Sequence, residues 1–96
     1  MNFKVFETLN GYKVLVDDAS VIVDDLADYI DSSKDFRTTE IRKCRGIAQS
    51  VIIVSGYKDI SRLREVVDLF FKVQEELRKV VDLFVKAQEE NVLQRP

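Results

Sequence analysis

Few residues in this chain belong to the types that usually carry catalysis or bind metals. It contains no histidine and a single cysteine, Cys44. A Ser-His-Asp triad, a Cys-His pair and nearly all zinc sites are therefore excluded, because each needs histidine or several cysteines. Cys44 follows Lys43 and precedes Arg45, whose positive charges would favour its thiolate form. A reactive or redox-sensing thiol is one interpretation, but we favour a half-buried cysteine in a strand.

Aspartates are concentrated in the first third of the chain. Asp17 and Asp18 are adjacent, and Asp24, Asp25 and Asp28 follow them. Paired carboxylates can bind a divalent cation or act as an acid and a base, but this spacing does not match the D-x-D-x-D-G calcium loop. The three glycines are isolated, so no glycine-rich phosphate loop is present. We interpret the aspartates as a solvated helix face, and expect no metal, no cofactor and no enzymatic activity.

Charge changes sign along the sequence. Residues 1–35 carry three lysines against eight acidic residues, a net charge of −5. Residues 36–64 carry seven basic residues against two acidic ones, a net charge of +5, and residues 65–96 carry five against seven, a net charge of −2. This distribution predicts one acidic and one basic surface. The candidate acidic partner surface is Asp24, Asp25, Asp28 and Asp31, and the candidate phosphate contacts are Arg37, Arg42, Lys43, Arg45, Lys58, Arg62 and Arg64.

The basic residues have two interpretations. If they lie close together, they form a basic patch that could bind the phosphates of DNA or RNA. An oligomer would repeat this patch by symmetry. Against this stand the net charge of −2, the lack of an evident helix-turn-helix motif and the few aromatic residues among the basic ones. The alternative is that they pair with the chain's own aspartates, within one subunit or between subunits.

The N-terminal residues have the pattern of a β-hairpin followed by a helix. "FKVFE" and "YKVLVDD" are rich in β-branched and aromatic residues, and Asn10-Gly11 between them favours a type I′ turn. Ser20 can cap a helix that runs to about Ser33. Its apolar face would consist of Val23, Leu26, Ala27 and Ile30. The competing interpretation is that "SVIVD" extends the preceding strand, because this sequence has high β-propensity.

A second hairpin and a long helix complete the predicted fold. "DFRTTEIRKC" reads as a strand, Arg45-Gly46 as a turn, and "IAQSVIIVSG" as a central strand buried on both faces. Asp59 or Ser61 can then cap a helix that reaches about Leu93 without an internal glycine or proline. The predicted class is α+β with the order ββαββα, in which two hairpins form a four-stranded antiparallel sheet. We assign the α+β core to residues 1–62, the long helix of the same domain to 63–93 and a tail to 94–96.

The long helix contains a tandem repeat. "REVVDLFFKVQEEL" at 64–77 is followed directly by "RKVVDLFVKAQEEN" at 78–91, and ten of the fourteen positions match. Apolar residues recur at alternating steps of three and four, the spacing of a coiled-coil seam. Two whole heptads return this seam to the same side, so the second copy lengthens an apolar surface without rotating it.

This helix is longer than the domain it belongs to. About 33 residues would span near 50 Å, whereas a compact chain of this size is only about 32 Å across. The second copy therefore has no cover within the monomer, and burial by another copy of the chain is the simplest solution. The predicted oligomer interface consists of Phe70, Val73, Leu77, Val80, Val81, Leu83, Phe84 and Ala87.

Three questions about the repeat stay open at this stage. Residues 76–79 could break the helix into a hairpin, although no Gly, Pro, Asn or Ser marks a turn there. The duplication could also be an accident or an engineered insertion without a function of its own. Leu or Phe alternating with Val favours four helices or antiparallel packing over a parallel pair, so the choice between dimer and tetramer is not fixed.

Together these patterns predict a small, non-enzymatic, self-associating protein that acts by binding another macromolecule, most simply another protein. A symmetric DNA- or RNA-binding regulator is the second hypothesis. The longest apolar run is four residues, Val51 to Val54, far below the roughly 20 that a membrane span needs. The N-terminus lacks the pattern of a signal peptide, and one cysteine cannot form an internal disulfide, so we expect a cytoplasmic protein.

Overall fold

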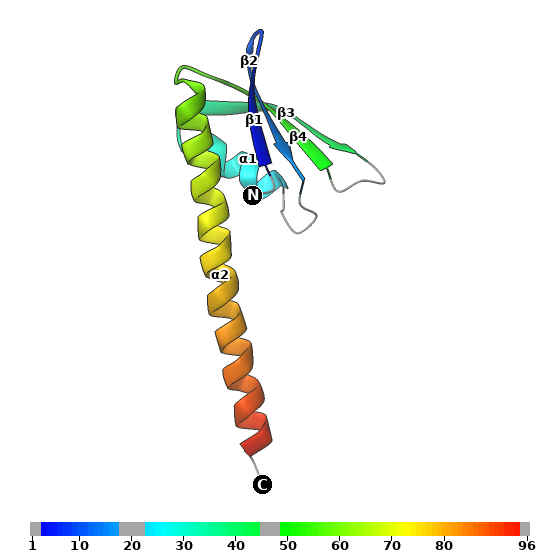
Figure 1. Cartoon of the computed structure of the whole chain (residues 1–96), viewed down its shortest axis with the longest axis vertical. Helices are drawn as coiled ribbons and strands as arrows, with labels where there is room; N and C mark the ends of the chain where they lie inside the picture. The colour runs from blue at the N-terminus through cyan, green and yellow to red at the C-terminus, as the bar shows by residue number, and fades with distance from the viewer. Residues whose placement is uncertain (1–2, 18–22, 45–48, 95–96) are drawn as a thin grey trace.

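The computed structural model describes residues 3–17, 23–44 and 49–94. Its elements follow the order ββαββα (Figure 1). The strands are β1 (Phe3–Thr8), β2 (Gly11–Val16), β3 (Phe36–Cys44) and β4 (Gln49–Gly56), and the helices are α1 (Val23–Ser32) and α2 (Ile60–Gln94). The strands form one antiparallel sheet in the order β1-β2-β4-β3. The predicted α+β class and element order are therefore confirmed.

The first hairpin forms, but its turn lies one residue earlier than the Asn-Gly pattern predicted. Thr8 pairs with Gly11, so the two connecting residues are Leu9 and Asn10. Among the described residues other than glycine, only Lys34 has a positive φ, so the type I′ prediction is wrong. Gly11 serves another purpose, because a Cβ there would collide with the carbonyl oxygen of Val54 on the neighbouring strand.

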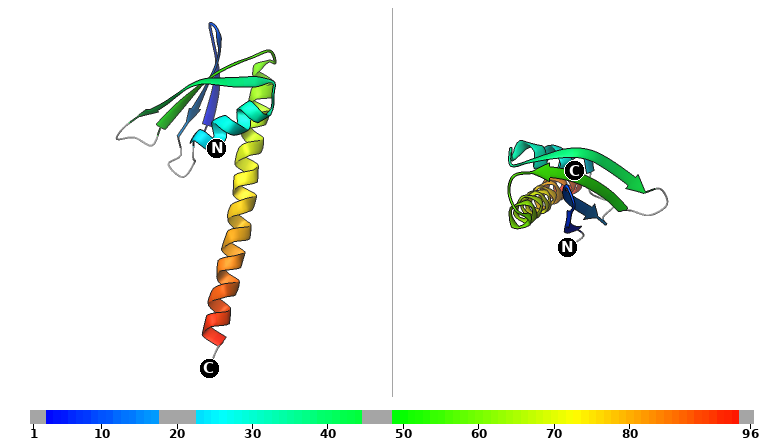
Figure 2. Two further views of the ribbon diagram at one scale, coloured as in Figure 1. Left: turned by 180° about the vertical axis from the view of Figure 1, so that it is seen from behind. Right: turned by 90° about the horizontal axis from the view of Figure 1, so that it is seen from above.

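Both helices cover the same face of the sheet and leave the other face open (Figures 1 and 2). The α1 face is the predicted one, with Val23, Leu26, Ala27 and Ile30 all buried. The predicted cap Ser20 and the predicted Arg45-Gly46 turn lie outside the described residues. At α2, Asp59 is the cap, because its carboxylate accepts a hydrogen bond of 3.1 Å from the backbone N–H of Arg62.

Strand β4 is central, as predicted, but it is not buried on both faces. Ile52 and Val54 point into the core and are almost fully buried, at 0% and 1% exposed. Val51 and Ile53 on the opposite face are only half-buried, because no helix covers that side. The sheet therefore has one covered face and one face open to solvent, as is common in antiparallel sheets.

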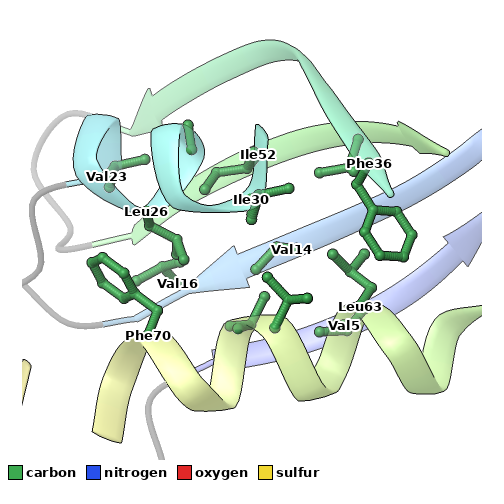
Figure 3. Close-up of a cluster of buried hydrophobic side chains, with 14 residues drawn as sticks. Val5, Val14, Val16, Val23, Leu26, Ile30, Phe36, Ile52, Leu63 and Phe70 are labelled. Carbon is green, nitrogen blue, oxygen red and sulfur yellow. The ribbon is translucent and has the colours of Figure 1, made fainter. Parts of the chain in front are cut away.

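The hydrophobic core lies between the sheet and the two helices (Figure 3). Strands β1, β2 and β4 contribute Val5, Val14, Val16, Ile52 and Val54, and the start of β3 contributes Phe36. Among its fully buried residues, helix α2 contributes only ones from its first third: Leu63, Val66, Val67 and Phe70. The remainder of α2 continues away from the domain without a break, so the alternative of a hairpin at 76–79 is wrong.

Candidate interaction surface

The repeat places the same four apolar residues in two opposite environments. The pattern Leu-x-x-Val-Val-x-x-Phe occurs at 63–70 and again at 77–84. The first set, which we call the proximal face, is Leu63, Val66, Val67 and Phe70, with 0%, 3%, 0% and 5% of each residue exposed. The second set, the distal face, is Leu77, Val80, Val81 and Phe84, with 54%, 62%, 56% and 64% exposed.

The contacts of the proximal face show what this pattern packs against. Phe70 lies in the core against α1, with its ring 5.5 Å from that of Tyr29. Next to it, Phe71 stacks on Phe3 of β1 at 5.0 Å. Within its own chain, the pattern thus packs against another helix and the sheet. The distal face has the same residues at the same spacing, but the core of this domain does not reach it.

The predicted interface residues are therefore not equivalent in the monomer. Phe70 is buried in its own domain, whereas the other seven lie on the free part of α2. Val73 and Leu83 flank the distal face and are 42% and 68% exposed, and Ala87 is exposed as well. Val85, on a neighbouring side of the helix, is 46% exposed. The distal face and these flanking residues form a continuous apolar strip, and monomeric proteins rarely expose such a strip to solvent.

The predicted basic residues do not form one patch. Arg37, Arg42 and Lys43 lie on β3 at one border of the sheet, whereas Arg64 lies beside β1 at the opposite border. Lys58 lies in the connection between β4 and α2. Arg45 lies outside the described residues, and so does the side chain of Cys44.

Several of these basic residues are held by the chain's own carboxylates. Arg42 donates two hydrogen bonds of 3.0 Å to Glu40, which lower the pKa of Glu40 and raise that of Arg42. Lys43 forms an ion pair of 3.3 Å with Asp24 on α1. One of the two interpretations of the sequence was that the basic residues pair with the chain's own aspartates. The ion pair of Lys43 with Asp24 agrees with it.

Arg62 is held in the same way at the start of α2. It forms ion pairs of 3.0 Å with Asp35 and 3.2 Å with Glu65, and its pKa is raised chiefly by the hydrogen bond to Asp35. This contact ties α2 to the residue that precedes β3. Like Arg42 and Lys43, Arg62 therefore pairs with carboxylates of its own chain.

The acidic surface on α1 is exposed along its whole length, at Asp24, Asp25, Asp28 and Asp31. Asp31 also accepts a hydrogen bond of 2.5 Å from the backbone N–H of Thr38 on β3. Across residues 3–17, 23–44 and 49–94, no three His, Cys, Asp or Glu residues come together in a group that could hold a metal ion. In the same part of the chain, no helix combines the length and the apolarity of a membrane span.

A groove between β1 and α2 was not anticipated from the sequence. It has a volume of about 710 Å³ and is lined by Phe3, Lys4, Val5, Phe6, Ser61, Arg64, Glu65 and Asp68. The alternation in "FKVFE" predicts the strand but not its place at the border of the sheet, which depends on the strand order. No local sequence signal reports that order.

Comparisons of the chain with protein-family models, with curated proteins and with solved structures find no match in any of the three.

Proposed function

We propose that this chain is a small, non-enzymatic binding or regulatory protein that self-associates through the distal half of α2 and acts through protein–protein contacts in the cytoplasm. One observation supports this most strongly: the distal face repeats, residue for residue, a face that is buried in the chain's own core. Moving each such side chain from water into an apolar contact is worth about 1.5–3 kcal/mol. Four of them, with their flanking residues, supply enough free energy to drive association.

A second copy of the chain is the partner that best fits this face. The core shows that the pattern packs well against a helix, because Phe70 contacts Tyr29 of α1. A second distal face offers a helix with the same apolar strip. Contact between two identical surfaces also closes under two-fold symmetry, which limits the assembly to a defined size.

The seam residues and the helix dipoles of α2 favour an antiparallel arrangement. Leu or Phe alternating with Val is not the usual seam of a parallel pair. In an antiparallel pair the two helix dipoles also oppose each other. Centring the pair on Phe84 places the largest side chains of the two distal faces at the same height.

Disulfide cross-linking tests both the face and its direction. Single-cysteine chains are made in a Cys44→Ser background, one carrying Val80→Cys and the other Gln88→Cys. An antiparallel pair centred on Phe84 places these two positions at the same height, so a mixture should form the mixed disulfide in preference to either symmetric one. Preferential cross-linking of Val80→Cys with itself indicates a parallel pair, and no cross-linking by either chain contradicts association through this face.

Nucleic-acid binding is the alternative function, and the structure gives it less support. Three of the six described basic candidates pair with the chain's own carboxylates, and Arg64 lies at the far border of the sheet from the candidates on β3. Phosphate contacts release counterions, so true binding weakens steeply as salt rises. The decisive experiment is a salt titration of DNA and RNA binding by the intact chain and by Arg42→Ala/Arg45→Ala. No binding at low salt rules this alternative out.

A further inference from the structure

Strand β1 is an open sheet edge with a groove along it, and this combination points to a function beyond self-association. The groove is lined by four consecutive residues of β1, Phe3 to Phe6. Successive side chains of a strand point to opposite faces, so four consecutive residues can border one groove only along the strand edge. On α2, the lining residues Ser61, Arg64, Glu65 and Asp68 follow the spacing of a single helix stripe. The groove therefore runs between the strand edge and the helix.

The other sheet edge, β3, is protected. Its backbone N–H at Thr38 is already bonded to the Asp31 carboxylate of α1, and the Thr38 hydroxyl donates to the carbonyl of Ala27 at 3.4 Å. A β-bulge at Thr39 also interrupts the regular edge. Such devices prevent other strands from pairing with an edge. In the described part of the chain, β1 has no bulge, and no hydrogen bond reaches its outer edge.

The helix side of the groove contains a carboxylate oxygen that lacks a donor. Asp68 bonds Lys72 through Oδ2 at 3.0 Å, but its Oδ1 is buried and has no hydrogen-bond partner among the described residues. A buried acceptor without a donor is costly and uncommon. Glu65, one helical turn away on the same stripe, adds a second carboxylate, which pairs with Arg62 at 3.2 Å. With Arg64 included, the stripe of Ser61, Arg64, Glu65 and Asp68 has a net charge of −1. This side of the groove therefore favours a ligand that brings hydrogen-bond donors and positive charge.

We propose that the groove between β1 and α2 binds an extended peptide segment of a partner protein, which adds a fifth strand to the sheet at β1. The backbone of the segment pairs with the open edge, the usual source of affinity in strand addition. Its inward side chains are basic and meet Glu65 and Asp68. Its outward side chains are apolar and extend the open sheet face beside Phe6. A second copy's β1 fits less well, because its inward polar residue is Glu7, which has the same charge as Glu65 and Asp68 on the helix side of the groove.

The probe is a synthetic peptide, acetyl-TVKVKVKVT-amide, titrated into the intact chain and followed by calorimetry. We expect saturable binding, and binding that is weaker by about tenfold or more when the lysines are replaced by glutamates, since hydrogen bonds to charged groups contribute this much. Amide hydrogen exchange of the complex should slow within residues 3–8. Slowing along β3 instead, or no binding in the millimolar range, overturns the proposal.

Four variants locate the site. Ser61→Trp fills the groove and should abolish binding, whereas Glu75→Trp, which adds the same side chain outside the groove, should leave it unchanged. Arg64→Glu makes the groove more acidic and should tighten binding severalfold, an outcome that misfolding cannot produce. Asp68→Leu should weaken binding by about tenfold while the domain stays folded. The proposal is contradicted if Ser61→Trp still binds the peptide. It is also contradicted if Ser61→Trp loses the mass of the oligomer, because a second copy would then fill the groove.

Discussion

Phe70 and Phe84 show that position, and not residue type, decides the role of a side chain in this molecule. Both follow the sequence Val-Val-Asp-Leu, yet Phe70 is 5% exposed and Phe84 is 64% exposed. The first is surrounded by the core, and the second lies on the part of α2 that the core does not reach. The sequence pattern alone assigned both to the interface, because local periodicity cannot tell which turn of a helix meets its own domain.

The two phenylalanines should respond differently to truncation. Phe70→Ala should lower the free energy of unfolding by about 3–5 kcal/mol, because it leaves a cavity in the core. Phe84→Ala should change it by less than about 0.5 kcal/mol when the chain is dilute enough to be monomeric, as expected for an exposed position. Chemical denaturation at low protein concentration measures both. Equal losses would contradict the burial described for α2.

The contact between Arg42 and Glu40 makes a prediction about ionisation. Its two hydrogen bonds lower the pKa of Glu40, so Arg42→Gln should raise that pKa towards its ordinary value. A depressed folded-state pKa stabilises the fold above the unfolded-state pKa, and this contribution is lost as pH falls through the folded-state value. NMR titration of the Glu40 carboxyl tests this, with Arg37→Gln as the control that should leave it unchanged.

At the scale of elements, the repeat predicts that its two copies are interchangeable in the core. Deleting residues 64–77 joins Leu63 to Arg78 and restores Leu-x-x-Val-Val-x-x-Phe at the same distance from β4. The shortened chain should therefore fold with Val80, Val81 and Phe84 in the core. It should be slightly less stable than the chain lacking 78–91, because Val85 replaces Phe71 and loses the stacking on Phe3. A chain lacking 64–77 that fails to fold would refute this equivalence.

The end of α1 carries a second element-scale prediction. Lys34, two residues beyond the helix, has a φ of 64°, a conformation that costs residues with a Cβ roughly 1 kcal/mol. Glycine adopts it without that cost, so Lys34→Gly should raise the free energy of unfolding by about 0.5–1 kcal/mol. Ser33→Gly is the matched control and should destabilise or have no effect. A lower melting temperature for Lys34→Gly would exclude this explanation.

The elements also show where prediction from sequence succeeds and where it stops. Local signals predicted both hairpins, the buried face of α1 and Asp59 as one of two candidate caps of α2, because each depends on residues that are near in sequence. Features that depend on distant contacts were missed. Gly11 is needed because a Cβ there would collide with the carbonyl oxygen of Val54 on the neighbouring strand. One face of β4 is open to solvent because both helices lie on the other face of the sheet. The groove at β1 exists because β1 is an edge strand. Periodicity carries no information about any of these.

At the scale of the whole molecule, the shape follows from the length of α2. The chain measures 65 × 30 × 19 Å and has a radius of gyration of 17.1 Å, compared with about 12–13 Å for a compact chain of this length. Figure 1 shows the reason, since most of α2 extends beyond the sheet and α1. A helix that extends this far gains little of its stability from its own domain. In our account, that stability comes from a second copy packed on the distal face.

The most direct test of this account is the molar mass in solution, measured by light scattering after size-exclusion chromatography at tens of micromolar. The intact chain should have at least twice the mass of a single chain. Phe84→Asp should have the mass of one chain, while the sheet, α1 and the proximal face of α2 stay folded. An intact chain that is monomeric at this concentration, or a Phe84→Asp variant that keeps the oligomer mass, would contradict the claim that the distal face of α2 holds copies of this protein together.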